Sequence, residues 1–127
     1  KNHRFDLSDL ILIKDNHIAA AGGIKNAIES AKNNKKNLKI EIECDNFKQV
    51  SQAIKSNPDI IMLDNMTPKQ IEKCSELIRS HKKIKIEVSG GITIDSIKNL
   101  KNLDIDFISI GSLTHSVKAV DIGLDVI

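Results

Sequence analysis

Tryptophan and tyrosine are absent from this chain of 127 residues, and phenylalanine occurs only three times. Proteins that hold single-stranded nucleic acids stack the bases on aromatic side chains, so this composition offers no such platform. The charge balance, 19 basic against 17 acidic residues with a net charge of +2, provides no strongly basic surface either. We therefore expect no nucleic-acid partner.

Long apolar runs and paired cysteines are also missing. No run approaches the roughly 18 apolar residues that cross a bilayer, and no signal peptide opens the sequence, so we expect no membrane partner. Cys44 and Cys74 stand far apart, which argues against a disulfide framework and against a zinc site. We expect reduced core thiols and a cytoplasmic protein.

An initiator methionine is absent as well, because the chain opens at Lys1-Asn2-His3-Arg4. We expect a fragment of a longer protein. The positive pattern in the sequence is a regular alternation of apolar strands with helical spacing. Strands are expected at about 10–13, 38–43, 60–63, 84–88 and 107–110.

This alternation predicts parallel βα units with right-handed crossovers. Two α/β architectures fit, a doubly wound sheet or parallel (β/α) units that form part of an open TIM-like barrel, and the barrel segment is our prediction. Helices are expected from Ile24, from an N-cap at Asp45, from an N-cap at Thr67, and from Asp95. A closing helix is expected near 119–127. Since a complete barrel needs eight units in about 250 residues, five units make an incomplete arc.

Polar residues or glycines follow every expected strand. Lys14 follows the first strand and Glu43 ends the second, while Asp64 follows the third. The last two strands lead into glycine-containing turns, at Ser89-Gly90-Gly91 and at Gly111-Ser112. Because the carboxyl ends of parallel strands meet at one edge, where α/β folds place their ligands, this pattern predicts a functional site there.

The chemistry at these strand ends suggests three kinds of ligand. Glycine turns that lead into helices let backbone N–H groups approach a phosphate. Glu43 and Asp64 are suited to ribose hydroxyls, or to Mg²⁺ held directly or through water, and Glu41 shares the strand face of Glu43. Arg4 and Lys14, with His3, form a cationic group for a small acid with several negative charges, and His115 lies close enough in sequence to the fifth strand to join it.

Several motifs stand in one order along the chain. They are His3-Arg4, the run from Ile11 to Ile18 that contains Lys14-Asp15-Asn16-His17, Ile40-Glu41-Ile42-Glu43, Met62-Leu63-Asp64-Asn65-Met66, Ser89-Gly90-Gly91-Ile92, Ile108-Ser109-Ile110-Gly111 and Leu113-Thr114-His115-Ser116. Together these motifs resemble the C-terminal part of the quinolinate phosphoribosyltransferase family. The resemblance implies that residues 1–127 are the C-terminal portion of the α/β-barrel domain, with an N-terminal domain and the first barrel strands outside it.

The resemblance also implies a pentosyltransferase reaction of NAD biosynthesis. Quinolinate attacks phosphoribosyl pyrophosphate, pyrophosphate and CO₂ are released, nicotinate mononucleotide forms, and Mg²⁺ is needed. The quinolinate ligands implied are His3, Arg4 and Lys14. The acids serving ribose and its metal are Glu43 and Asp64, His115 lines the pocket, and the 5′-phosphate loops comprise Ser89, Gly90, Gly91, Ile110, Gly111 and Ser112.

Some features depart from the family pattern or favour other classes. Asp6 and Asp104 stand where the family usually has small residues, often glycine. Family members are about twice as long and complete their sites in a homodimer or higher homo-oligomer, so we expect these residues alone to be inactive. The alternatives are the related transferase found with molybdate transport, a non-catalytic fragment, and a generic phosphate-binding barrel in which Lys14 forms a Schiff base.

Overall fold

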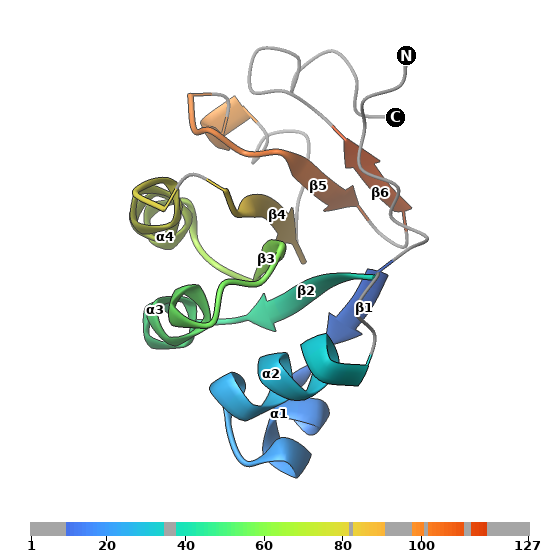
Figure 1. Ribbon diagram of the computed structural model, residues 1–127. Coiled ribbons are helices and arrows are strands. Elements are labelled where there is room, and N and C mark those ends of the chain that lie inside the picture. The colour runs from blue at the N-terminus through green and yellow to red at the C-terminus, as the bar shows by residue number, and fades with distance from the viewer. Residues whose placement is uncertain are drawn as a thin grey trace.

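The computed structural model describes residues 10–34, 38–81, 83–90, 98–100, 102–110 and 113–116, with the backbone alone at 110 and 113–116. Strands and helices alternate along the described chain (Figure 1). In order, the elements are β1 (Leu10–Ile13), α1 (Asp15–Ala21), α2 (Ile24–Asn34), β2 (Lys39–Cys44), α3 (Phe47–Lys55), β3 (Ile60–Asp64), α4 (Pro68–Arg79), β4 (Lys85–Ser89), β5 (Phe107–Ile110) and β6 (Leu113–Ser116).

The strands form one sheet in which spatial order follows chain order, from β1 to β6. β1 to β5 are parallel, and β6 pairs antiparallel with β5. A doubly wound sheet reverses its strand order at a switch point, whereas a (β/α) barrel adds each strand beside the previous one. The described sheet has no such reversal, which confirms the predicted barrel segment and excludes the doubly wound alternative.

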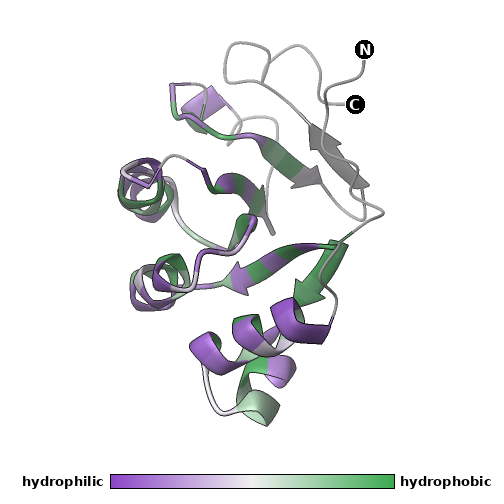
Figure 2. Ribbon diagram, in the orientation of Figure 1, coloured by the Kyte–Doolittle hydropathy of each residue, from purple (hydrophilic) through white to green (hydrophobic). Residues whose placement is uncertain are grey.

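The two faces of the sheet differ in what covers them. On β2, Ile40, Ile42 and Cys44 belong to the apolar core that α2, α3 and α4 cover, while the intervening Glu41 and Glu43 point to the opposite face. The same alternation continues on β3 and β4. Figure 2 shows apolar colour on β1, alternating apolar and polar colour along β2, and mixed colour on the helices, as expected for a sheet covered by amphipathic helices. The face that none of the described helices covers is the inside of the barrel segment.

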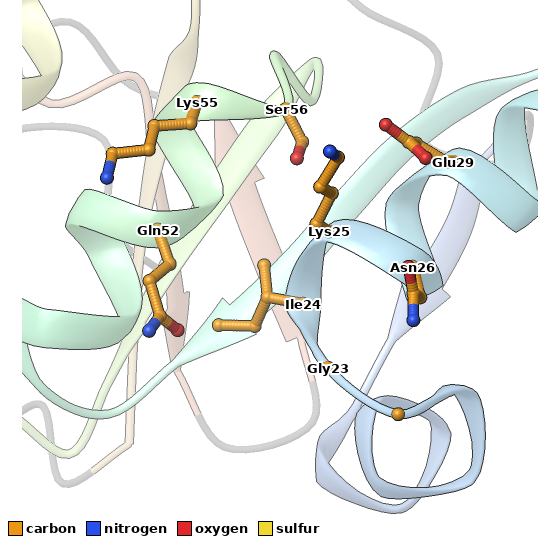
Figure 3. A pocket seen from close by; sticks show the side chains of 9 residues that line it. Gly23, Ile24, Lys25, Asn26, Glu29, Gln52, Lys55 and Ser56 are labelled. Carbon is orange, nitrogen blue, oxygen red and sulfur yellow. The ribbon is translucent and has the colours of Figure 1, made fainter.

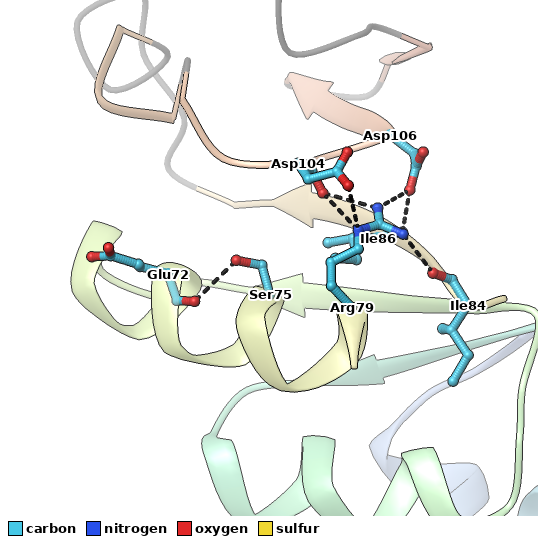
Figure 4. Close-up of polar contacts among 7 residues, drawn as sticks. All are labelled: Glu72, Ser75, Arg79, Ile84, Ile86, Asp104 and Asp106. Atoms are coloured by element: carbon cyan, nitrogen blue, oxygen red, sulfur yellow. Dashed lines mark hydrogen bonds and ion pairs between the residues drawn. The ribbon is translucent and has the colours of Figure 1, made fainter. Parts of the chain in front are cut away.

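Carboxylates organise the amino-terminal edge of this sheet. Asp59 precedes β3, and its Oδ2 accepts a 2.8 Å hydrogen bond from the Ile40 N–H of the neighbouring strand. Asp106 precedes β5 and does the same for the Ile86 N–H, at 2.9 Å. Arg79, at the end of α4, donates to Asp106 Oδ2 at 2.6 Å (Figure 4). Each aspartate therefore satisfies a strand N–H that would otherwise lack an acceptor.

Three expectations about local structure need correction. No helix was expected directly after Lys14, but the residues from Asp15 form α1, and the His17 ring accepts the N–H of Lys14 at its first turn. The N-cap of α3 is Asn46 rather than Asp45, because the Asn46 side chain accepts the Gln49 N–H at 2.8 Å. β6 was not expected. The predicted helices from Asp95 and over 119–127 lie outside the described residues.

Asp104 shows what one departure from the family pattern does. Its side chain forms an ion pair with Arg79 Nε at 3.0 Å, and its backbone carbonyl accepts from both Nε and Nη2 of the same arginine. The side chain of Asp104 is mostly exposed, so this ion pair contributes little to stability. Asp104 therefore belongs to the amino-terminal edge, away from the predicted ligand site.

Candidate active site

Lys14 stands at the carboxyl end of β1 and begins α1 as its N-cap. Ile13 pairs with Ile42, so Lys14 and Glu43 follow at the same level of neighbouring strands. The positive charge of Lys14 is close enough to lower the pKa of Glu43, against the larger effects that raise it. The first two predicted strand ends therefore meet at one edge, as parallel pairing requires.

Glu43 and Asp64 bring two carboxyl groups to this edge. Burial raises the pKa of Glu43, and repulsion from Asp64 raises it further, with smaller contributions from Asp15 and Asp45. The pKa of Asp64 is raised by burial first and then by Asp45 and Asp15. Within the described part of the chain, neither side chain has a hydrogen-bond or ion-pair partner. An edge of this kind favours a ligand that brings positive charge.

Gly90 joins the same group of strand ends. Its φ is +82°, a left-handed conformation that favours glycine, and a Cβ there would collide with the Asn65 side chain and come within 3.0 Å of Asp64 Oδ1. Ser89 pairs with Asp64 in the ladder, and the Asn65 N–H donates to the Ser89 carbonyl at 3.0 Å. The first predicted phosphate turn therefore lies directly against the predicted ribose acid.

A second pair of acids lies inside the barrel segment, below the edge. Glu41 is 3% exposed and Glu87 is 2% exposed. Burial raises the pKa of Glu41 to about 10, with further contributions from Glu87 and Glu43, so Glu41 is protonated at neutral pH. Oε2 of Glu41 has no hydrogen-bond partner, whereas Glu87 accepts a hydrogen bond from the Ser109 hydroxyl. Glu41 therefore points into the barrel segment, on the strand face that it was predicted to share with Glu43.

The contact between Glu41 and Glu87 also supports the barrel. In the sheet register, Glu41 of β2 pairs with Ile60 of β3, and Ile60 pairs with Lys85 of β4. Glu87 therefore lies two residues beyond the β4 residue that is level with Glu41. Two residues over two strand steps is a stagger of one residue per strand. An eight-stranded barrel with a shear of 8 has this stagger, and its interior layers come from alternate strands such as β2 and β4.

The remaining predicted site residues are not tested by the structure. His3, Arg4, Gly91, Gly111 and Ser112 lie outside the described residues. Ile110 ends β5 and His115 lies in β6 opposite Ile108, and at both positions the backbone alone is described. The roles of all the predicted site residues, those at the described edge included, stay predictions.

Two residues at the site were missed in the sequence. Glu87 alternates with the buried residues of β4, just as Glu41 does on β2, so the same alternation rule identifies it. His17 carries no such signal, because its role depends on a helix beginning at Lys14.

A pocket of about 470 Å³ lies elsewhere, between α2 and α3 (Figure 3). Lys25 and Glu29 of α2 and Gln52 and Lys55 of α3 are among its lining residues. No residue of the strand ends lines this pocket, so it lies apart from the edge described above.

The described residues contain no cluster of three or more potential metal ligands. Mg²⁺ in phosphate-handling enzymes is commonly held by one or two carboxylates together with waters and substrate phosphates. Glu43 and Asp64 fit that kind of shared site, since burial and then repulsion from Asp64 raise the pKa of Glu43, and a cation between the two carboxylates would relieve that repulsion. In the described part of the chain, no helix has the length and apolarity to span a membrane.

The fold and the strand ends define this molecule as a segment of a (β/α)-barrel protein with its polar groups gathered at the carboxyl edge of the sheet. Residues 1–125 match the family described as "Quinolinate phosphoribosyl transferase, C-terminal domain". The chain belongs to this family.

Individual relatives agree with the family match. The chain is 47% identical to a probable nicotinate-nucleotide pyrophosphorylase (carboxylating) of Methanocaldococcus jannaschii, over 98% of this chain and 46% of the relative. It is 35% identical to the human nicotinate-nucleotide pyrophosphorylase (carboxylating), over 97% of this chain and 42% of that protein. The crystal structure of NadC from Streptococcus pyogenes superposes with a TM-score of 0.75 at 44% identity, covering 92% of this chain and 41% of that one. The chain thus spans less than half the length of these relatives.

Proposed function

We propose that this chain forms the phosphoribosyl-transfer edge of a quinolinate phosphoribosyltransferase. The enzyme joins the ring nitrogen of quinolinate to the ribose of phosphoribosyl pyrophosphate and releases pyrophosphate and CO₂, which gives nicotinate mononucleotide. The chain belongs to this family, and Lys14, Glu43, Asp64 and Gly90 come together at the carboxyl edge of its sheet. This arrangement is the observation that carries the proposal. The proposal is also supported by the name of a relative with 47% sequence identity, a probable nicotinate-nucleotide pyrophosphorylase (carboxylating).

Among the residues that the structure describes, Lys14 is the proposed cationic ligand of the acceptor, quinolinate. Quinolinate carries two carboxylates, and an ammonium group on a rigid strand end binds one of them as a point charge. His3 and Arg4 complete the proposed cationic group, because a guanidinium holds a carboxylate through two parallel hydrogen bonds. The cations fix the acceptor so that its ring nitrogen faces the ribose, and that orientation accounts for much of the rate enhancement.

Glu43 and Asp64 serve the donor. As the bond from C1′ to pyrophosphate breaks, positive charge develops on the ribose, and carboxylates already in place stabilise that charge. Their raised pKa values reflect the cost of holding negative charge without a partner, and a ligand with positive charge removes that cost. The two carboxylates therefore interact more favourably with the positively charged transition state than with solvent in the empty site.

The glycine turns serve the 5′-phosphate. Ser89 and Gly90 lie beside Asp64, so a phosphate at this turn places the ribose hydroxyls next to that acid. Gly91, Ile110, Gly111 and Ser112 complete the proposed phosphate loops, and His115 lines the pocket. Glycine permits the close approach of backbone N–H groups that a phosphate needs.

Decarboxylation follows from the product of the transfer step. Once the ring nitrogen carries the ribose it is cationic, so the electron pair left at C2 when CO₂ departs is stabilised by the adjacent positive charge. The carbon then takes a proton from solvent. No acid–base pair from the protein is required for this step, and the described edge needs to provide only binding and orientation.

Mg²⁺ is part of the proposal. Glu43 and Asp64 would hold it directly or through water, and it would neutralise the pyrophosphate of the donor when bound. The cytoplasmic location and the homodimer or higher homo-oligomer are also proposed. Two buried, unpaired thiols, Cys44 and Cys74, support a reducing compartment.

The test uses a protein of the relatives' length that contains these residues, assayed for nicotinate mononucleotide, CO₂ and pyrophosphate. Glu43→Gln and Asp64→Asn should each lower kcat on the order of 10²- to 10³-fold, the loss typical when one group that stabilises transition-state charge is removed. Asp45→Asn is the matched control, because Asp45 is an acid at the same edge without a proposed role, and it should stay within a few-fold.

Three outcomes would contradict the proposal. Equal effects of all three substitutions would mean that only the net charge of the edge matters. Transfer to another acceptor but none to quinolinate would favour the homologue found with molybdate transport. Trapping of Lys14 by borohydride would instead indicate Schiff-base chemistry.

A further inference from the structure

The three helices that follow β1, β2 and β3 share one device at their first turn. In each, the side chain at the third helical position reaches back to a backbone N–H just after the strand end. Gln49 Oε1 accepts from the Asp45 N–H at 2.7 Å, and Gln70 Oε1 accepts from the Thr67 N–H at 2.9 Å. In α1 the same position is His17, whose Nδ1 accepts from the Lys14 N–H at 3.1 Å.

The turn at Lys14 differs from the other two in its N-cap. Asn46 and Thr67 are ordinary capping residues whose side-chain oxygens accept the N–H of Gln49 and Gln70. Lysine cannot act this way, because its ammonium group is a donor only. Among the described residues, the His17 ring is therefore the side chain that holds the first turn of α1.

A lysine at an N-cap breaks a local rule that the two other turns obey. Such exceptions are expected where a residue is kept for function rather than for helix stability. Lys14 has a second property that fits this view, since its charge acts on Glu43 across the edge. The Lys14 side chain is thus available to a ligand because it takes no part in capping, and another side chain holds its backbone.

We propose that His17 is a positioning residue, which fixes the backbone of Lys14 through Nδ1 so that the ammonium group is directed at a carboxylate of the acceptor. This inference rests on the proposed function of Lys14 as an acceptor ligand. An Nδ1 that accepts must carry a lone pair, so the ring is neutral with its proton on Nε2. The ring does not touch the acceptor and acts only through Lys14.

The chain itself offers the substitutions that test this inference. His17→Gln places at α1 the residue that α3 and α4 already use, so it should retain the hydrogen bond and acceptor binding. His17→Ala removes the acceptor and should raise the KM for quinolinate about fivefold, the equivalent of one net hydrogen bond. The KM for phosphoribosyl pyrophosphate should change less than twofold. Gln70→Ala is the matched control, because it deletes the same contact from α4 and should leave the quinolinate KM unchanged.

A double-mutant cycle separates positioning from general stability. If His17 acts through Lys14, then His17→Ala should have no further effect on the quinolinate KM in a Lys14→Ala background. Additive effects, or failure of His17→Gln to retain the wild-type KM, would overturn the inference. The kinetics are measured on a protein of the relatives' length that contains this chain.

A spectroscopic measurement distinguishes failure of this inference from failure of the proposed function. Nitrogen-15 NMR of the same protein reports the His17 tautomer, and we expect the proton on Nε2. A proton on Nδ1 would overturn the inference whatever the ligand. If the proton is on Nε2 but Lys14→Ala leaves the quinolinate KM unchanged, the role proposed for Lys14 is wrong. His17 would then have no acceptor ligand to position.

Discussion

The two edges of the parallel sheet use the same chemical group in opposite ways. At the amino-terminal edge, Asp59 and Asp106 accept strand N–H groups at 2.8 and 2.9 Å, and Arg79 contacts Asp106 (Figure 4). At the carboxyl edge, Glu43 and Asp64 have no such partners among the described residues, and burial and like charges raise their pKa values. A carboxylate that has hydrogen-bond partners within the fold stabilises the fold, whereas a carboxylate without such partners is available for a ligand.

The reason for this difference is the direction of the strands. In a parallel sheet each strand enters at one edge and leaves at the other, so the entering segments can be tied to the preceding strand by short side chains such as aspartate. The leaving segments must open into turns that lead to helices. Ligand sites therefore gather at the carboxyl edge, and the amino-terminal edge contributes stability.

The largest stability effect is expected from Asp106→Ala. It removes the acceptor of the Ile86 N–H, which belongs to a fully buried residue, and it breaks the contact with Arg79. We expect a loss of roughly 2–3 kcal/mol in the free energy of unfolding, because a buried donor is left unsatisfied. Urea denaturation measures it. Asp106→Asn keeps an acceptor and should cost less, and equal losses would show that charge rather than the hydrogen bond matters.

Glu41→Gln tests a carboxyl group that lies between the two edges. Since the pKa of Glu41 is raised from 4.5 to about 10, the folded chain binds the proton more tightly than the unfolded chain, so stability falls as the pH rises through that interval. Glutamine cannot ionise, so Glu41→Gln should remove this decline and be more stable than the wild type at alkaline pH. Denaturation at several pH values checks this.

A parallel decline in wild type and Glu41→Gln would contradict that prediction. It would mean that other groups cause the alkaline loss of stability. Glu41 would then resemble Asp59 and Asp106, whose hydrogen-bond partners are part of the fold. Glu87→Gln is the companion variant, because Glu87 has the Ser109 hydroxyl as a donor and Glu41 Oε2 has none.

Gly90→Ala sharpens the comparison at the carboxyl edge itself. At a φ of +82°, alanine adds about 1–2 kcal/mol of backbone strain, and its Cβ would meet Asn65 and Asp64. We expect lower stability together with weaker binding of a phosphate-containing donor, measured by calorimetry. Gly23→Ala is a useful control, because Gly23 also has a positive φ of +139° but has open space where a Cβ would lie. It should lose stability without affecting the donor.

The smallest effect is expected from Glu43→Gln on stability. Because the pKa of Glu43 is raised, the folded state loses stability as the pH rises above the ordinary carboxyl range, and the amide avoids that loss. We expect a gain of a few tenths of a kcal/mol at neutral pH, as the side chain is partly exposed to solvent. This sign is opposite to that for Asp106→Ala. A clear loss of stability would mean that Glu43 has a structural partner after all.

Much of the sheet was predictable because buried parallel strands leave strong apolar signals. β1 and β5 begin and end where expected, and β2, β3 and β4 agree within one residue. α1 was missed, because Lys14 is not a capping residue and the acceptor for its N–H comes from the ring of His17. The cap at Asn46 was misplaced by one position, since Asp45 and Asn46 are both good capping residues.

The sequence by itself determined the alternation of strands and helices, the family, and the chemical groups that follow each strand. These are local properties, because apolar periodicity and motif order do not depend on how strands are paired. Tertiary structure alone decided which carboxylates find partners. The stagger of the strands brings Glu41 to Glu87, and the order of the sheet brings Gly90 to Asp64. Both contacts join residues distant in sequence, and burial then changes their ionisation.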